Sequence, residues 1–140
     1  MTTLYLIDKS ALARVARSPA VQAALIRLDE TGVLATSAIV DLEIGYSARN
    51  LTEFDSVAAD RAELYQQLPL TPAVTDRARQ VQRQLVRAGQ HRGPGVPDLL
   101  IAATAELNNA TVVHYDRDYD TIAAITGQPV EWIVPAGSVP

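Results

Sequence analysis

Short runs of apolar, mostly β-branched residues alternate along the chain with longer stretches in which apolar residues recur at helical spacing. Turn-forming or polar residues bound each short run, as they do around buried strands. We therefore predict five strands, of which the third has the weakest pattern, at residues 4–7, 33–37, 68–70, 111–115 and 130–134. Strands separated by helices pair in parallel through right-handed crossovers. The pattern predicts an α/β fold with a central parallel sheet of about five short strands flanked by helices.

Two of the predicted helices begin with the same local signal. Ser18 and Thr71 each place a capping hydroxyl before a proline at the first helical position. The first signal opens a helix over 19–31, which Gly32 ends, and the second opens an arginine-rich helix. Another amphipathic helix is predicted over 53–67. These amphipathic helices are too many for one side of so small a sheet, so we expect a homodimer.

Composition limits the chemistry that the chain can perform. A length of 140 residues with 48% hydrophobic content predicts one domain, 1–140, with a real core. The absence of cysteine excludes disulfide scaffolds, thiolate zinc sites and cysteine nucleophiles. Asp8 and Lys9 interrupt the N-terminus before a secretory segment could form, and the longest apolar run, 99–105, is far too short to span a membrane. We expect a cytoplasmic protein without membrane contact.

The charge distribution is more informative than the net charge of −4. Residues 77–92 contain five arginines and no acid, so this window carries +5 and the remainder −9. A basic stripe on an acidic body is typical of a nucleic-acid surface beside a cation site. An ordinary solvated helix face explains the same window without any ligand.

Several acids stand where functional groups gather in parallel sheets, at the carboxyl ends of strands and the starts of the following helices. Asp8 follows the first strand, Asp116 follows the fourth, and Asp98 opens a helix. Each also has a structural explanation: Asp8 and Asp98 as helix caps, and Asp116 in an Asx-turn.

Glu43 has no such explanation, because it lies inside the helical stretch 38–48, far from a helix end. Apolar Leu42 and Tyr46 beside it place it at the edge of the stripe expected to be buried. Burying a carboxylate is costly without a cation or hydrogen bonds. The alternative to a ligand role is a salt bridge to Lys9 or to an arginine.

Carboxylates that converge without cysteine or a histidine cluster favour a hard cation, Mg²⁺ or Mn²⁺, over zinc. Asp118 is either a second-tier ligand or a capping residue, and Asp120 complements the dipole of the next helix. Ser10 is interpreted as a cap or a hydrogen-bond donor to the acids. His114 is interpreted as a packed residue and not as a base.

Four stretches together resemble the PIN-domain ribonucleases, in particular the VapC toxins of bacterial toxin–antitoxin pairs, over essentially the full length. They are YLIDKSAL, TSAIVDLEIGYSAR, VPDLLIAATAE and VVHYDRDYDTIA. The resemblance implies a PIN domain over 1–140 and a metal site on Asp8, Glu43, Asp98 and Asp116, with Asp118 as an addition. It also implies a small cognate antitoxin of the VapB kind. Lys9 departs from the family, where a small hydroxyl residue is frequent, and would tune metal affinity.

The hypothesis is therefore Mg²⁺-dependent hydrolysis of RNA phosphodiester bonds, with Mn²⁺ able to substitute. A basic surface would grip the RNA backbone, formed by Arg79, Arg83, Arg87, His91 and Arg92. One alternative is an aspartyl-nucleophile phosphatase, although such enzymes carry a second Asp where this chain has Ser10. The other is a binding module whose acid cluster is vestigial.

Overall fold

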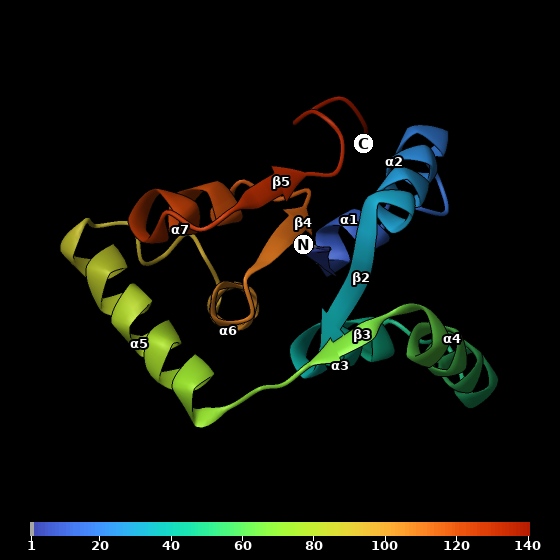
Figure 1. Cartoon of the computed structure of the whole chain (residues 1–140), viewed down its shortest axis with the longest axis horizontal. Coiled ribbons are helices and arrows are strands. Elements are labelled where there is room, and N and C mark those ends of the chain that lie inside the picture. The colour runs from blue at the N-terminus through green and yellow to red at the C-terminus, as the bar shows by residue number, and fades with distance from the viewer. Residues whose placement is uncertain (1) are drawn as a thin grey trace.

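A computed structural model describes residues 2–140, which form a five-stranded sheet with helices packed on both faces (Figure 1). In chain order the elements are β1 (Thr3–Ile7), α1 (Lys9–Leu12), α2 (Pro19–Thr31), β2 (Gly32–Ser37), α3 (Ala38–Tyr46), α4 (Leu51–Leu64), β3 (Gln66–Leu68), α5 (Pro72–Arg87), α6 (Val96–Leu107), β4 (Ala110–His114), α7 (Asp118–Thr126) and β5 (Val130–Trp132).

The sheet is entirely parallel, with the strand order β3-β2-β1-β4-β5. The chain winds outward from β1 through β2 to β3, then returns to the other side of β1 as β4 and β5. The direction of winding therefore reverses between β1 and β4, and the carboxyl ends of these two strands border the crevice where such sheets bind ligands. The α/β prediction and all five strands are confirmed.

Two predicted boundaries were wrong in the same region. The strand expected at 68–70 is Gln66–Leu68, which pairs with β2 from Ala35 to Ser37. The helix expected over 53–67 runs from Leu51 to Leu64, because the Asn50 side chain caps it by accepting a hydrogen bond from the Glu53 amide at 2.8 Å. Strand pairing with β2 thus overrides the helical pattern after Leu64.

The two helix starts predicted at Ser18 and Thr71 are confirmed. Ser18 Oγ accepts a hydrogen bond from the Val21 amide at 3.2 Å, and Thr71 Oγ1 does the same for Val74 at 3.3 Å. Gly32 ends α2, and a Cβ at that position would lie 2.5 Å from the Thr3 carbonyl oxygen. Only glycine therefore allows β2 to start directly after α2 beside β1.

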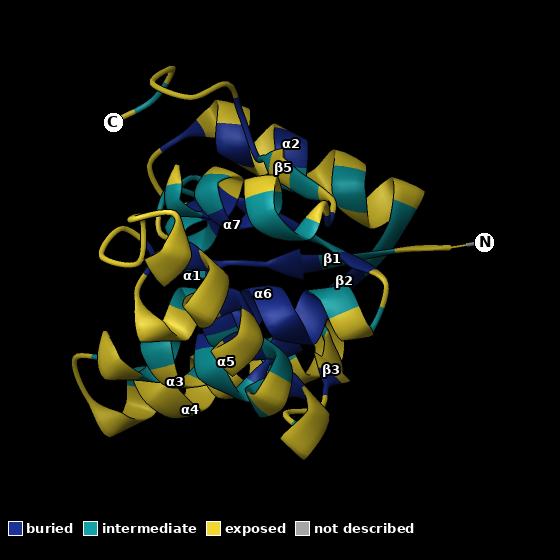
Figure 2. Cartoon of the chain, turned by 90° about the vertical axis from the view of Figure 1, so that its left-hand side faces the viewer, coloured by how far each residue is buried: buried dark blue, intermediate teal, exposed yellow. Residues whose placement is uncertain are grey.

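Two buried clusters cover the two faces of the sheet. Leu6 and Val112 point into the cluster formed with α5, α6 and α7, whereas Ile7 and Val113 point into the cluster formed with α2. Figure 2 shows β1 running between α2 and the mostly buried α6. Of the helices in residues 2–140, none combines the length and the apolarity needed to cross a membrane.

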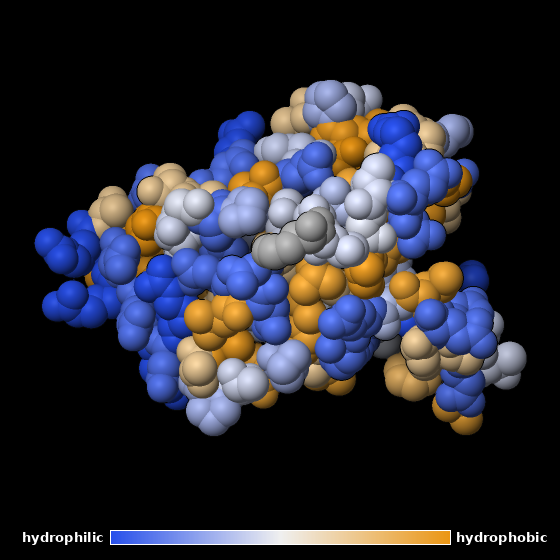
Figure 3. All heavy atoms as spheres, in the orientation of Figure 1, coloured by the Kyte–Doolittle hydropathy of each residue, from blue (hydrophilic) through white to orange (hydrophobic). Residues whose placement is uncertain are grey.

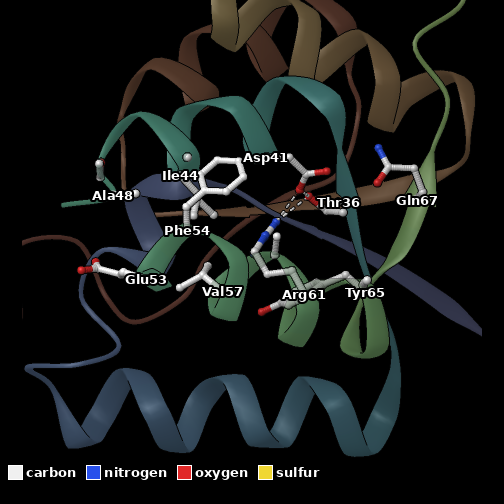
Figure 4. Close-up of a pocket in the computed structure, with 14 residues that line it drawn as sticks. Thr36, Asp41, Ile44, Ala48, Glu53, Phe54, Val57, Arg61, Tyr65 and Gln67 are labelled. Carbon is white, nitrogen blue, oxygen red and sulfur yellow. Dashed lines mark hydrogen bonds and ion pairs between the residues drawn. The ribbon is translucent and has the colours of Figure 1, made fainter. Parts of the chain in front are cut away.

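Helix α4 stands apart from the body of the molecule and has no fully buried residue (Figures 1 and 3). Its firmest link is Arg61, whose Nη2 donates to Asp41 Oδ1 at 2.9 Å and to Thr36 Oγ1 at 2.6 Å. Figure 4 shows this link on the wall of a cavity of about 490 Å³ between α3 and α4, beside the Phe54 ring. The polar contacts of Arg61 therefore anchor α4 to α3 beside the Phe54 ring.

Candidate metal centre

The ends of β1 and β4 are joined by one backbone hydrogen bond and by one from a backbone amide to a serine side chain. The Asp8 amide donates to the Val113 carbonyl at 2.9 Å, and the Tyr115 amide donates to Ser10 Oγ at 2.8 Å. Asp8 caps α1, since its Oδ2 accepts from the Ser10 amide at 3.0 Å and from Ser10 Oγ at 2.6 Å. The switch point of the sheet thus presents a buried carboxylate that a neighbouring serine holds in place.

Asp98 occupies a different helical position from the one expected. Helix α6 begins at Val96 with Gly95 as its N-cap, so Asp98 is the third helical residue and not the cap itself. Its Oδ2 accepts a hydrogen bond from the Gly95 amide at 3.1 Å. The carboxylate therefore lies at the N-terminus of α6, where the helix dipole favours negative charge.

Asp116 makes the expected Asx-turn, because its Oδ1 accepts a hydrogen bond from the Asp118 amide at 2.9 Å. Asp118 is the first residue of α7 and is not its cap, since Arg117 holds that position. One carboxylate oxygen from each of Asp98, Asp116 and Asp118 lies within 4.8 Å of the others. Asp120 lies in the first turn of α7, as expected, and accepts from Trp132 Nε1 at 3.0 Å.

Asp8 and Glu43 border this three-acid group without belonging to it. The Glu43 side chain makes neither a hydrogen bond nor an ion pair with any residue in 2–140, so the salt bridge to Lys9 or an arginine does not form. The apolar stripe expected beside it, Ile39, Leu42 and Tyr46, was wrong in part: Ile39 packs against the core, but Leu42 and Tyr46 are 70% and 90% exposed. The helical period alone cannot tell which side of α3 faces the sheet.

The electrostatics of the group reflect crowded negative charge. Burial raises the pKa of Asp98 to about 6; the Gly95 amide opposes this shift, while the charges of Asp8, Asp116 and Asp118 add to it. The pKa of Asp118 is raised by burial and then by Asp116. The pKa of Glu43 is raised by burial and by Asp8, and lowered by Lys9. A bound cation would relieve this repulsion.

The donor set fits a hard divalent cation. Every side chain in the three-acid group offers carboxylate oxygen, and the chain has no cysteine that would favour a softer metal. Asp98, Asp116 and Asp118 can supply one ligand atom each, with Asp8 and Glu43 adjacent. Asp118 thus belongs to one group with Asp98 and Asp116, whereas Asp8 and Glu43 lie beside that group.

Two buried residues, Tyr119 and His114, form hydrogen bonds with the acids, and neither role was predicted from the sequence. Tyr119 Oη donates to Asp8 Oδ1 at 2.7 Å, and His114 Nδ1 accepts from the Asp116 amide at 3.1 Å. His114 is fully buried, as expected, and its ring lies 5.1 Å from the Tyr119 ring and 4.9 Å from that of Trp132. The signal in the sequence is the position of Tyr119 among several acids. A buried phenol needs a hydrogen-bond partner, and a nearby carboxylate can be that partner.

The basic residues lie on the outer side of α5 and in the turn after it. Val74, Ala78, Val81 and Leu85 form the buried side of this helix, and Figure 3 shows hydrophilic atoms gathered over it and over the following turn, at the left of the view. Arg79 forms an exposed ion pair with Asp76 at 2.9 Å, and Arg83 and Arg87 border a shallow hollow.

The turn after α5 passes beside the acids. At Gly93 a Cβ would lie 3.5 Å from Asp118 Oδ1, and the exposed His91 and Arg92 precede that glycine directly. The basic surface therefore approaches the acid group through this turn.

Comparison with known proteins identifies the family and agrees with the fold. A family model described as PIN domain matches residues 5–125. Ribonuclease VapC51 of Mycobacterium tuberculosis is 45% identical over 139 residues, covering 99% of each chain, and ribonuclease VapC21 of the same species is 45% identical over 138 residues, again covering 99% of each.

Solved structures share the fold at lower identity. The structure of VapBC-1 from nontypeable Haemophilus influenzae matches with a TM-score of 0.77 at 17% identity, covering 94% of this chain and 98% of the other. VapBC2 from Rickettsia felis, bound to a DNA fragment from its promoter, matches with a TM-score of 0.76 at 19% identity, covering 92% and 98%. With near-full-length identity of 45% to curated relatives and a PIN-domain model that matches residues 5–125, the chain belongs to the PIN-domain family, within its VapC ribonucleases.

Proposed function

We propose that this protein is a divalent-metal-dependent endoribonuclease, the toxin of a VapBC-type pair, whose site comprises Asp8, Glu43, Asp98, Asp116 and Asp118. The observation that carries the proposal is the oxygen-only group of Asp98, Asp116 and Asp118 at the topological switch point. An RNA substrate also accords with a cytoplasmic location.

The side chains divide the work of hydrolysis according to their surroundings. Asp98, Asp116 and Asp118 would hold Mg²⁺ or Mn²⁺, which on binding lowers the pKa of a water ligand and offsets charge on the scissile phosphate. Glu43 has a free carboxylate with a raised pKa, which suits it to orient the attacking water and accept its proton. Asp8 would be a further ligand of this ion, and its charge acts on both Glu43 and Asp98.

The RNA backbone would lie along the basic surface, with His91 and Arg92 nearest the acids and Arg79, Arg83 and Arg87 further along α5. These side chains are exposed, and the buried side of α5 points away from them. Phosphate contacts of this kind would position RNA of any sequence, so the choice of cleavage site must depend on other contacts.

The proposed partners are a VapB-like antitoxin and a second copy of the chain. The solved structures that share this fold include VapBC complexes. A basic or aromatic tail that enters the acidic site would be the simplest inhibitor. For the homodimer, the support is the exposed apolar surface on α3 and α4, including Leu42, Tyr46, Leu51 and Leu64.

The test is cleavage of RNA by purified protein with Mg²⁺, with Mn²⁺ and with EDTA. We expect cleavage with either ion, none with EDTA, and loss of at least a hundredfold for Asp98→Ala, since it removes a ligand. Asp55→Ala, an exposed acid on α4, is the matched control and should cleave like wild type. Wild-type cleavage by Asp98→Ala would contradict the proposal, and metal-free protein that binds no ion would favour the vestigial binding module.

A further inference from the structure

Tyr119 has the largest side chain among the fully buried residues, and it lies in the first turn of α7 directly after Asp118. Its hydroxyl does not reach solvent. Instead, Oη donates to Asp8 Oδ1 at 2.7 Å, across 111 positions of sequence. The phenol therefore links the acid at the end of β1 to the segment that carries Asp116 and Asp118.

The two oxygens of Asp8 have different hydrogen-bond partners. Oδ2 accepts two hydrogen bonds, from the Ser10 amide at 3.0 Å and from Ser10 Oγ at 2.6 Å. Within residues 2–140, Oδ1 accepts only the one from Tyr119. Because an ionised carboxylate offers about four lone-pair sites, two on each oxygen, Oδ2 is saturated and Oδ1 keeps one site free. Oδ1 is thus the atom of Asp8 that can still bind a cation.

We propose that Tyr119 is a positioning residue that presents Asp8 Oδ1 to the metal ion, an inference that rests on the function proposed above. The donors on the two oxygens come from two different elements, α1 and α7, so together they fix the plane of the carboxylate. The Tyr119 ring also packs on His114, whose Nδ1 accepts from the Asp116 amide. The Tyr119 side chain thereby contacts Asp8 directly and Asp116 through His114, and it fixes the two acids relative to each other.

A purely structural role predicts a different result. A buried phenol requires a hydrogen-bond partner, so the contact with Asp8 stabilises the fold whether or not a metal binds. A positioning role requires in addition that loss of the hydroxyl weakens metal binding through Asp8. Outer partners of metal ligands typically contribute about 10- to 100-fold in metal affinity.

The experiment measures Mn²⁺ binding to metal-free protein by isothermal titration calorimetry, beside thermal unfolding without metal. Tyr119→Phe keeps the ring and removes only the hydroxyl, and we expect it to weaken Mn²⁺ binding by about 10- to 100-fold. Tyr115→Phe is the matched control, because its hydroxyl bonds only to the Val139 backbone, at 2.8 and 3.1 Å. It should lower the melting temperature and leave the dissociation constant unchanged.

A double-mutant cycle with Asp8→Asn tests the route of the effect. If Tyr119 acts through Asp8, adding Tyr119→Phe to Asp8→Asn should change Mn²⁺ affinity by less than about twofold. Wild-type affinity in Tyr119→Phe, or equal losses in both backgrounds, would overturn this inference alone. Absence of Mn²⁺ binding by wild type would overturn the proposed function as well.

Discussion

A carboxylate at a strand end can cap a helix with one oxygen and keep the other for a further contact, and Asp8 shows how. Its Oδ2 caps α1 through the Ser10 amide, while its Oδ1 faces Tyr119 from the other side. Asp116 likewise makes a turn with one oxygen. Structural and functional explanations of these acids are therefore compatible, because a carboxylate has more acceptor sites than a cap or turn uses.

The metal site should be detectable from the thermal stability of an Asp98 variant, without an activity assay. Its folded-state pKa of about 6 lies above the ordinary value of 3.8, so protonation stabilises the fold fully below about pH 4, and this contribution is lost as pH rises through about 6. Metal-free Asp98→Asn should therefore melt at a higher temperature than wild type at pH 7. The difference should shrink as pH falls from about 6 to about 4.

The measurement is thermal unfolding against pH, with and without Mg²⁺. At a hundredfold excess over its dissociation constant, Mg²⁺ should stabilise wild type by about 2.7 kcal/mol and Asp98→Asn much less. Asp55→Asn, an exposed acid on α4, should leave the melting temperature little changed. An Asp98→Asn variant that is neutral or destabilised, with no response to Mg²⁺ in either protein, would mean that these acids do not form a metal site.

At the scale of elements, α4 depends on a single polar link. Arg61 is 11% exposed at its side chain and joins α4 to Asp41 on α3. Arg61→Met keeps the aliphatic stem but removes the charged hydrogen bonds, which should cost about 2 kcal/mol of unfolding free energy. The measurement is urea denaturation. Arg49→Met is the control, since the Arg49–Glu53 pair is exposed and should contribute no more than about 0.5 kcal/mol.

The basic side chains on the outer side of α5 give a second prediction, which concerns RNA binding. If Arg83 and Arg87 contact phosphate, Arg83→Glu with Arg87→Glu should weaken RNA binding at any sequence and flatten its salt dependence by roughly 0.7 per lost contact. Salt-dependent binding titrations measure this slope. The double reversal of the exposed Arg17 and Arg27, on the opposite side of the sheet, matches the change in net charge. If both double variants change the salt slope equally, the effect comes from net charge and not from contacts of Arg83 and Arg87 with phosphate.

At the scale of the whole molecule, exposed apolar side chains predict association. Leu42, Tyr46, Leu51 and Leu64 are between 62% and 90% exposed on α3 and α4. Apolar surface of this kind is typical of contacts with another chain. Light scattering at micromolar concentration should give twice the 15.1 kDa mass of one chain. A mass of 15.1 kDa that persists on concentration would contradict the homodimer.

Local sequence signals predict most of the elements and the end of the sheet at which the acids lie. Ser18 and Thr71 cap their helices through contacts three residues apart, and such local contacts can be predicted from the order of residues. The parallel sheet then brings the carboxyl ends of β1 and β4 together, which predicts where Asp8 and Asp116 lie.

Which side-chain atoms come together at this end of the sheet depends on the tertiary packing. Asp118 joins Asp98 and Asp116 within 4.8 Å, while Asp8 and Glu43 lie beside them. Tyr119 meets Asp8 because α7 packs with α5 and α6 on one face of the sheet, and no pattern in the sequence sets that packing. Helical periodicity identifies an apolar stripe, but the side of a helix that becomes buried depends on the elements that pack against it.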